Sequence, residues 1–131
     1  MKTLIASIAA ITLAASFSVK AQEDDGFGRP DINSGRSVFN MTCASCHSLN
    51  RGENGTGPSL AGVYGRRAGS VADFAYSEPI RKSGLTWTED TLDTYLRNPS
   101  NLGTQVNMII HGIVDKKMRA DLISFLKHNA K

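Results

Sequence analysis

Cysteine is scarce in this 131-residue chain, and its scarcity excludes one common kind of site. The chain has two cysteines, Cys43 and Cys46, and three histidines. A structural zinc site takes four ligands, mostly Cys and His at characteristic spacing. Beyond His47 only His111 and His128 remain, and both lie far along the sequence. The two cysteines are therefore not half of a zinc centre.

Long basic runs are also absent, which argues against a nucleic-acid-binding role. The chain has 15 Lys and Arg against 12 Asp and Glu, and two of the 15 are Lys2 and Lys20. Removal of the first 21 residues would leave 13 against 12, a net charge of +1. Any charge that guides a partner must then be local, and an ordinary solvated surface is the alternative. The local clusters are Arg66 with Arg67, Arg81 with Lys82, and Lys116 and Lys117 with Arg119.

Long apolar runs are missing except near the N-terminus. Lys2 precedes an apolar run over 4–19, and Ala21 ends a stretch with small residues at the cleavage positions. We interpret residues 1–21 as a cleaved secretory signal peptide. The run is short and rich in Ala and Ser for a membrane span, with an uncleaved anchor as the alternative. The sequence thus predicts a periplasmic protein, secreted across the inner membrane and without stable membrane insertion.

The remaining residues are enough for one small domain. Residues 22–30 are polar and Gly-containing, and we expect a flexible N-terminal tail there. Residues 31–131 are then the folded domain. No internal repeat or low-complexity tract interrupts them.

The most informative feature that is present is the run Cys43-Ala44-Ser45-Cys46-His47. Two thiols at this spacing can each add to a haem vinyl group, and the adjacent imidazole can bind the iron. This is the signature of c-type haem attachment. A bare Cys-x-x-Cys could also be a structural disulfide or a thioredoxin-like pair, but the latter needs a βαβ pattern. The sequence predicts one haem c, covalently attached through Cys43 and Cys46, with His47 as a metal ligand.

Hydrophobic periodicity predicts helices and no convincing strands. We expect helices over about 33–46, 88–98 and 115–128, and a shorter one over 77–83. Asn33 or Ser34 is expected to cap the first helix. Thr88 should cap the second, and Pro99 should stop it.

The last helix has a clear apolar face, with Arg119 and Lys127 expected outside it. Met41 and Met118 are interpreted as core-filling methionines. The apolar face comprises Met118, Leu122, Phe125 and Leu126.

Six glycines and Pro58 fall between Asn50 and Gly69, too many for regular structure. Glycine lets the backbone approach another group closely. We interpret the stretch as a loop that folds over a flat cofactor. An ordinary flexible surface loop is the alternative.

Taken in order, these blocks resemble the class I cytochromes c over roughly residues 31–130. The resemblance implies an all-α cytochrome c fold, with three to five helices and Gly-rich loops wrapped around one haem. The blocks are Gly35-x-x-x-Phe39, the haem motif, Gly57-Pro58-Ser59-Leu60-Ala61-Gly62, Tyr64-Gly65-Arg66-Arg67, Phe74-x-Tyr76, Gly84-Leu85-x-Trp87, Tyr95-Leu96-x-Asn98-Pro99, Met108 and Arg119-Ala120-Asp121-Leu122-Ile123-x-Phe125-Leu126.

The resemblance also implies iron ligands. His47 would be the proximal ligand, and the Pro58 carbonyl would accept its other ring proton. Met108 would be the sixth ligand and a second metal-binding residue, with Tyr95 beside its sulfur. For Met108 the alternative is a core-filling methionine.

Further roles follow from the same resemblance. Arg66, Tyr76 and Trp87 would bond or neutralise the haem propionates. The alternatives are a surface charge for Arg66 and core aromatics for Tyr76 and Trp87. Gly35 and Phe39 would meet the last helix near Leu122 and Phe125, where a small residue permits a close crossing.

The sequence departs from the family pattern just before Met108. A Pro-Gly turn, a Thr and a Lys usually stand there, whereas this chain has Thr104, Gln105, Val106 and Asn107. Asn107 removes a docking charge, and Ile110 stands where an aromatic residue often covers the haem edge. We hypothesise that the loop opens readily and that His111 replaces Met108 at raised pH. A plain surface histidine is the alternative.

The function implied is a mobile electron carrier, not an enzyme. With His47 and Met108 both on the iron, no coordination position is open to a substrate. The expected partners are membrane or periplasmic redox complexes that donate and accept electrons, and the expected state is a monomer. One alternative is a ligand-binding haem protein, a gas sensor or weak peroxidase, with a labile sixth ligand. Another is a detachable electron-transfer subunit of a periplasmic enzyme.

Overall fold

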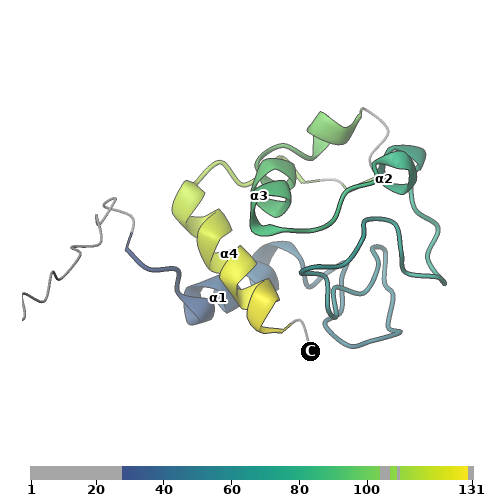
Figure 1. Cartoon of the computed structure of the whole chain (residues 1–131). Helices are drawn as coiled ribbons and strands as arrows, with labels where there is room; N and C mark the ends of the chain where they lie inside the picture. The colour runs from purple at the N-terminus through teal and green to yellow at the C-terminus, as the bar shows by residue number, and fades with distance from the viewer. Residues whose placement is uncertain (1–27, 104–106, 109, 130–131) are drawn as a thin grey trace, which may run out of the picture.

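The structure, a computed structural model, describes residues 28–103, 107–108 and 110–129. Within these residues the regular structure is helical and no strand forms, as the all-α prediction requires (Figure 1). The predicted signal peptide and most of the predicted tail lie outside the described residues. The elements are α1 (Ile32–Thr42), α2 (Glu78–Lys82), α3 (Glu89–Arg97), the 3₁₀ helix η1 (Pro99–Leu102) and α4 (Lys116–His128).

Helix α1 begins one residue earlier than predicted, and its expected cap was wrong. Asp31 is the N-cap, and its carboxylate accepts hydrogen bonds from the backbone N–H groups of Asn33 (2.7 Å) and Ser34 (3.0 Å). The two residues expected to cap the helix therefore supply the donors. Their amides are among the first backbone groups of a helix, which have no partner inside it.

Helix α1 also ends earlier than the predicted Cys46, at Thr42. Beyond it the backbone tightens, because the Ala44 N–H bonds Phe39 O at 3.0 Å and the Cys46 N–H bonds Cys43 O at 3.0 Å. The His47 N–H bonds the same Cys43 oxygen at 2.9 Å. The haem motif is thus a compact turn at the end of α1.

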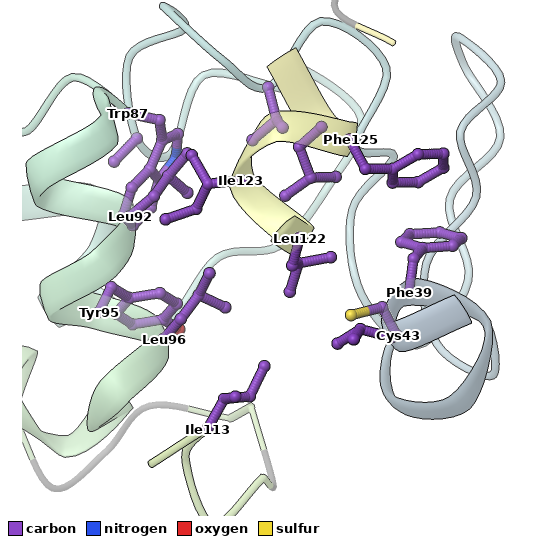
Figure 2. Close-up of a cluster of buried hydrophobic side chains, with 14 of the residues drawn as sticks. Phe39, Cys43, Trp87, Leu92, Tyr95, Leu96, Ile113, Leu122, Ile123 and Phe125 are labelled. Carbon is purple, nitrogen blue, oxygen red and sulfur yellow. The ribbon is translucent and has the colours of Figure 1, made fainter. Parts of the chain in front are cut away.

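Helix α1 crosses α4 closely, and this crossing forms one wall of the core (Figure 2). A Cβ on Gly35 would lie 2.8 Å from Phe125 Cβ and nearer still to the Asp121 carbonyl oxygen, so only glycine fits there. Phe39 packs on Phe125 with ring centroids 5.6 Å apart. The predicted contact of Gly35 and Phe39 with the last helix is confirmed.

The other helix boundaries agree with the sequence. Thr88 caps α3: its hydroxyl accepts from the Thr91 N–H, and the Thr91 hydroxyl accepts from the Thr88 N–H in return. Asp115 caps α4 by accepting from the Met118 N–H at 2.8 Å. Pro99 does stop α3, and it also starts η1, which the sequence did not predict.

Three side-chain placements were wrong. Arg119, expected outside the apolar face of α4, is only 3% exposed, so it does not belong to a surface charge cluster. Met41 is 71% exposed and Met118 is 37% exposed, so neither fills the core. Met41 lies next to the end of α1.

No helix in the described part of the chain is both long enough and apolar enough to cross a bilayer.

Candidate cofactor site

A cavity of about 310 Å³ lies between α3, α4, the haem motif and the Gly-rich loop. Most of its walls are apolar. All nine residues predicted for the cofactor line it, although they come from segments far apart in the sequence. They are Cys43, Cys46, His47, Pro58, Arg66, Tyr76, Trp87, Tyr95 and Met108.

The imidazole of His47 is held from two sides. Its Nδ1 lies 2.7 Å from the carbonyl oxygen of Pro58. A carbonyl can only accept, so Nδ1 carries the proton and Nε2 keeps the lone pair that a metal would use. Gly57 lies against the ring, and a Cβ there would be 2.6 Å from Nδ1 and 2.7 Å from Nε2. The backbone at 57–58 therefore fixes both the tautomer and the position of the ring.

Both thiols are free and adjoin the same cavity. Cys43 is the C-cap of α1 and is buried, with 7% of its surface exposed. Burial raises the pKa of the Cys43 thiol, against an opposing hydrogen bond from Thr42. Cys46 is half-buried.

Met108 lines the same cavity, although it lies far along the sequence from the haem motif. Its sulfur accepts a hydrogen bond from the Tyr95 hydroxyl at 3.4 Å. The Tyr95 ring packs on Trp87 with centroids 5.1 Å apart, and burial raises the pKa of Tyr95 to about 12. The phenol therefore stays protonated and donates to the sulfur at all ordinary pH values.

Arg66 is half-buried, and its guanidinium is bonded to the chain. Its guanidinium donates to the carbonyl oxygens of Ala61 (2.6 Å) and Ser59 (2.9 Å), and desolvation lowers its pKa. Its Nε is the one buried side-chain polar atom without a hydrogen-bond partner among the described residues. A buried donor of this kind is costly unless something accepts from it.

The Tyr76 hydroxyl accepts from the Val71 N–H at 3.3 Å, and its ring packs edge-on against Phe74. Tyr76 and Trp87 thus line the cavity and also pack as aromatic residues of its wall. The geometry is compatible with both interpretations of these two side chains.

The apolar wall of the cavity was only partly foreseen. Leu92, Leu96, Leu122 and Leu126 line it, and their spacing of four residues marked them as core faces of α3 and α4. Leu60 and Val63 also line the cavity, from the Gly-rich loop, where no periodicity pointed to them.

His111 is exposed and does not line the cavity, whereas Ile110 does. In this arrangement His111 has the position of a surface histidine. Asn107, which stands where the family carries a docking lysine, is exposed at the cavity rim.

Comparison with known proteins agrees with this geometry. The sequence model of the Cytochrome c family matches residues 32–130. The chain is 48% identical over 90 residues to cytochrome c2 iso-2 of Magnetospirillum fulvum, covering 69% of this chain and 93% of that protein. It is 40% identical over 107 residues to cytochrome c of Cochliobolus lunatus, covering 81% and 99% respectively. It is also 40% identical over 102 residues to cytochrome c of Arabidopsis thaliana, covering 77% and 91%.

The chain belongs to the cytochrome c family, and it is a class I c-type cytochrome. Its cofactor is haem c, attached through Cys43 and Cys46. The site fits that group, because the cavity offers two thiols, an oriented imidazole and the unpartnered Arg66 donor. The protein is an electron carrier and not an enzyme.

Proposed function

We propose that the protein is a soluble periplasmic carrier of single electrons, and that His47 and Met108 are the residues that would bind its haem iron. One observation carries this proposal: both side chains line one cavity, and each is oriented by its own hydrogen bond. Pro58 O orients the imidazole at 2.7 Å, and Tyr95 OH bonds the thioether at 3.4 Å.

Bound haem supplies an iron that alternates between the ferric and ferrous states. His47 and Met108 would both hold the iron, which would leave no coordination position for a substrate. A thioether is a soft ligand that favours ferrous iron and raises the reduction potential. The hydrogen bond from Tyr95 limits rotation of the Met108 side chain.

The propionate role is proposed for Arg66 in particular. Its Nε is buried and unpartnered, and a propionate oxygen is an acceptor of suitable charge. Tyr76 and Trp87 line the same cavity, and we assign them supporting positions around these groups.

Absorption spectra of the haem-loaded protein test the ligation. We expect a far-red thioether-to-iron band in the ferric state, low-spin ferrous peaks and no response to carbon monoxide. Met108→Ala should lose the far-red band and bind carbon monoxide. A parent protein without the band that binds carbon monoxide rapidly would instead support a ligand-binding haem protein.

Cell fractionation tests the location. The apolar run after Lys2 supports export, and haem attachment outside the cytoplasm is consistent with it. We expect the mature protein in the periplasmic fraction, beginning at Gln22. A membrane-bound product beginning at Met1 would identify residues 1–21 as an anchor.

The proposed partners are redox complexes that donate and accept electrons, met one at a time by a monomer. Arg81 and Arg67 are exposed and remain candidates for weak electrostatic guidance. Electron-transfer rates with an isolated donor complex should then fall as salt concentration rises. A rate independent of salt would exclude guidance by charge.

A further inference from the structure

Arg119 and Asp121 are the two buried charged residues among those the structure describes, and haem attachment uses neither. Arg119 lies in the first turn of α4, only 3% exposed. A cation in the first turn of a helix is opposed by the helix dipole, and a buried guanidinium must be paired. A charged Arg119 at this position therefore needs partners that compensate for both costs.

Its partners belong to two different segments. Nε donates to Asp93 Oδ1 at 2.6 Å, and Nη2 lies 3.5 Å from Asp93 Oδ2, which ties α4 to α3. Nη1 donates to the carbonyl oxygens of Ile113 (2.7 Å) and Val114 (2.8 Å). Both carbonyls lie near the end of the segment that connects Met108 to α4. The planar fork of an arginine can serve such divergent acceptors at once, whereas a lysine cannot.

The same segment is joined to α3 at a second place. The Ile113 N–H bonds Leu96 O at 2.8 Å, and Gly112 packs against the Arg97 carbonyl. Ile113 is 8% exposed and belongs to the core that includes Leu96 (Figure 2). Ile113 lies five positions after Met108, so fixing Ile113 keeps the Met108 Cα within about 17 Å of the Ile113 Cα.

We propose that Arg119 is a positioning residue for the Met108 thioether. It joins α3, which carries Tyr95, to the segment that carries Met108. This link keeps the Tyr95 hydroxyl within hydrogen-bond distance of the Met108 sulfur. This inference rests on the proposed ligation by Met108. Loss of Arg119 should let the segment open locally while the haem stays attached to Cys43 and Cys46.

The test uses the haem-loaded protein and the substitution Arg119→Gln. We expect a weaker far-red band, and carbon monoxide binding to the ferrous protein faster by about tenfold, because the buried carbonyls lose charge-assisted hydrogen bonds. Hydrogen exchange at the Ile113 amide should also accelerate. Arg119→Lys keeps the charge without the fork, and its effects should be intermediate.

Two controls separate positioning from general destabilisation. Lys117→Gln removes the same charge from the same turn of α4, but Lys117 bonds Asp121 at 2.6 Å on the side facing α1. Phe39→Leu weakens the α1–α4 crossing far from the Met108 segment. Both should leave the carbon monoxide rate within about twofold of the parent protein, since the contacts they remove are Lys117–Asp121 and Phe39–Phe125 and not those of Ile113 and Val114.

Arg119→Gln at the parent rate, or controls that match its acceleration, would overturn the proposal. If Arg119→Gln does not yield haem-loaded protein, Asp93→Asn can replace it. This substitution weakens the Arg119–Asp93 pair at its half-exposed member and should also accelerate carbon monoxide binding. Met108→Ala serves as the reference. A parent lacking the far-red band would overturn both this inference and the proposed ligation. If the parent has the far-red band, Met108→Ala loses it and Arg119→Gln keeps the parent's band and carbon monoxide rate, this inference alone is overturned.

Discussion

The two sides of the haem cavity are held in different ways. On the His47 side the contacts are local: the Pro58 carbonyl, the Gly57 backbone and the bond to Cys43 O all lie within eleven residues of the ring. On the Met108 side they come from two helices: Tyr95 and Leu96 belong to α3, and Arg119 belongs to α4. A ligand held within its own loop depends mainly on that loop, whereas one held from two helices depends on how those helices pack.

Removal of both thiols should have the largest effect. Cys43→Ala with Cys46→Ala eliminates both thioether bonds, so no haem should remain with the chain on denaturing electrophoresis. Ser45→Ala is the matched control within the motif and should retain its haem. Covalent haem in the double variant would show that another residue takes part in attachment.

Gly112→Ala should loosen the Met108 side. Gly112 has φ +78° and approaches the Arg97 carbonyl, so alanine is both strained and crowded. We expect a loss of about 1–3 kcal/mol in the free energy of unfolding and a weaker far-red band. Gly84→Ala is the control, because Gly84 has φ +66° with open space around its Cβ position. A Gly112→Ala protein with an unchanged band would contradict the long-range support of Met108.

Gly57→Ala addresses the His47 side. The new methyl group would press on the imidazole ring, and we expect destabilisation by about 1–3 kcal/mol with the far-red band retained. Denaturant unfolding and absorption spectra of the same samples measure both quantities. Thr56→Ala is the neighbouring control. A lost band in Gly57→Ala would mean that the two sides are coupled more tightly than their contacts indicate.

The smallest effect should come from Asp31. Backbone hydrogen bonds from Ser34 and Asn33 hold the pKa of this carboxyl below its ordinary 3.8. The folded state thus favours the charged form, so its contribution to stability is present above pH 3.8 and is lost as pH falls through the lowered pKa. Asp31→Asn keeps an acceptor without the charge and should flatten this part of an acid-unfolding curve. An unchanged curve would exclude Asp31 as a source of acid sensitivity.

The same contrast explains what could be predicted from the sequence. The haem motif, the Thr88 cap and the leucines of α3 and α4 follow local rules of spacing and capping. The early end of α1 could not be predicted in this way. Periodicity alone extends the helix to Cys46, whereas the hydrogen bonds from the Ala44 and Cys46 N–H groups tighten the backbone into a turn.

Arg119 shows the other limit of sequence reasoning. Its position in a helical pattern suggested a solvent-facing charge, and its partner Asp93 is 26 residues away. No local pattern links the two residues. Burial of a charge is decided by tertiary pairing, which periodicity does not record.

The burial of Cys43 sets an order of events in biogenesis. Cys43 is 7% exposed, and burial raises the pKa of its thiol, so the completed fold presents little reactive thiolate. Helix α1, whose C-cap is Cys43, packs on α4. We therefore expect haem to be joined to the chain before these two helices dock, and their docking to close the product afterwards.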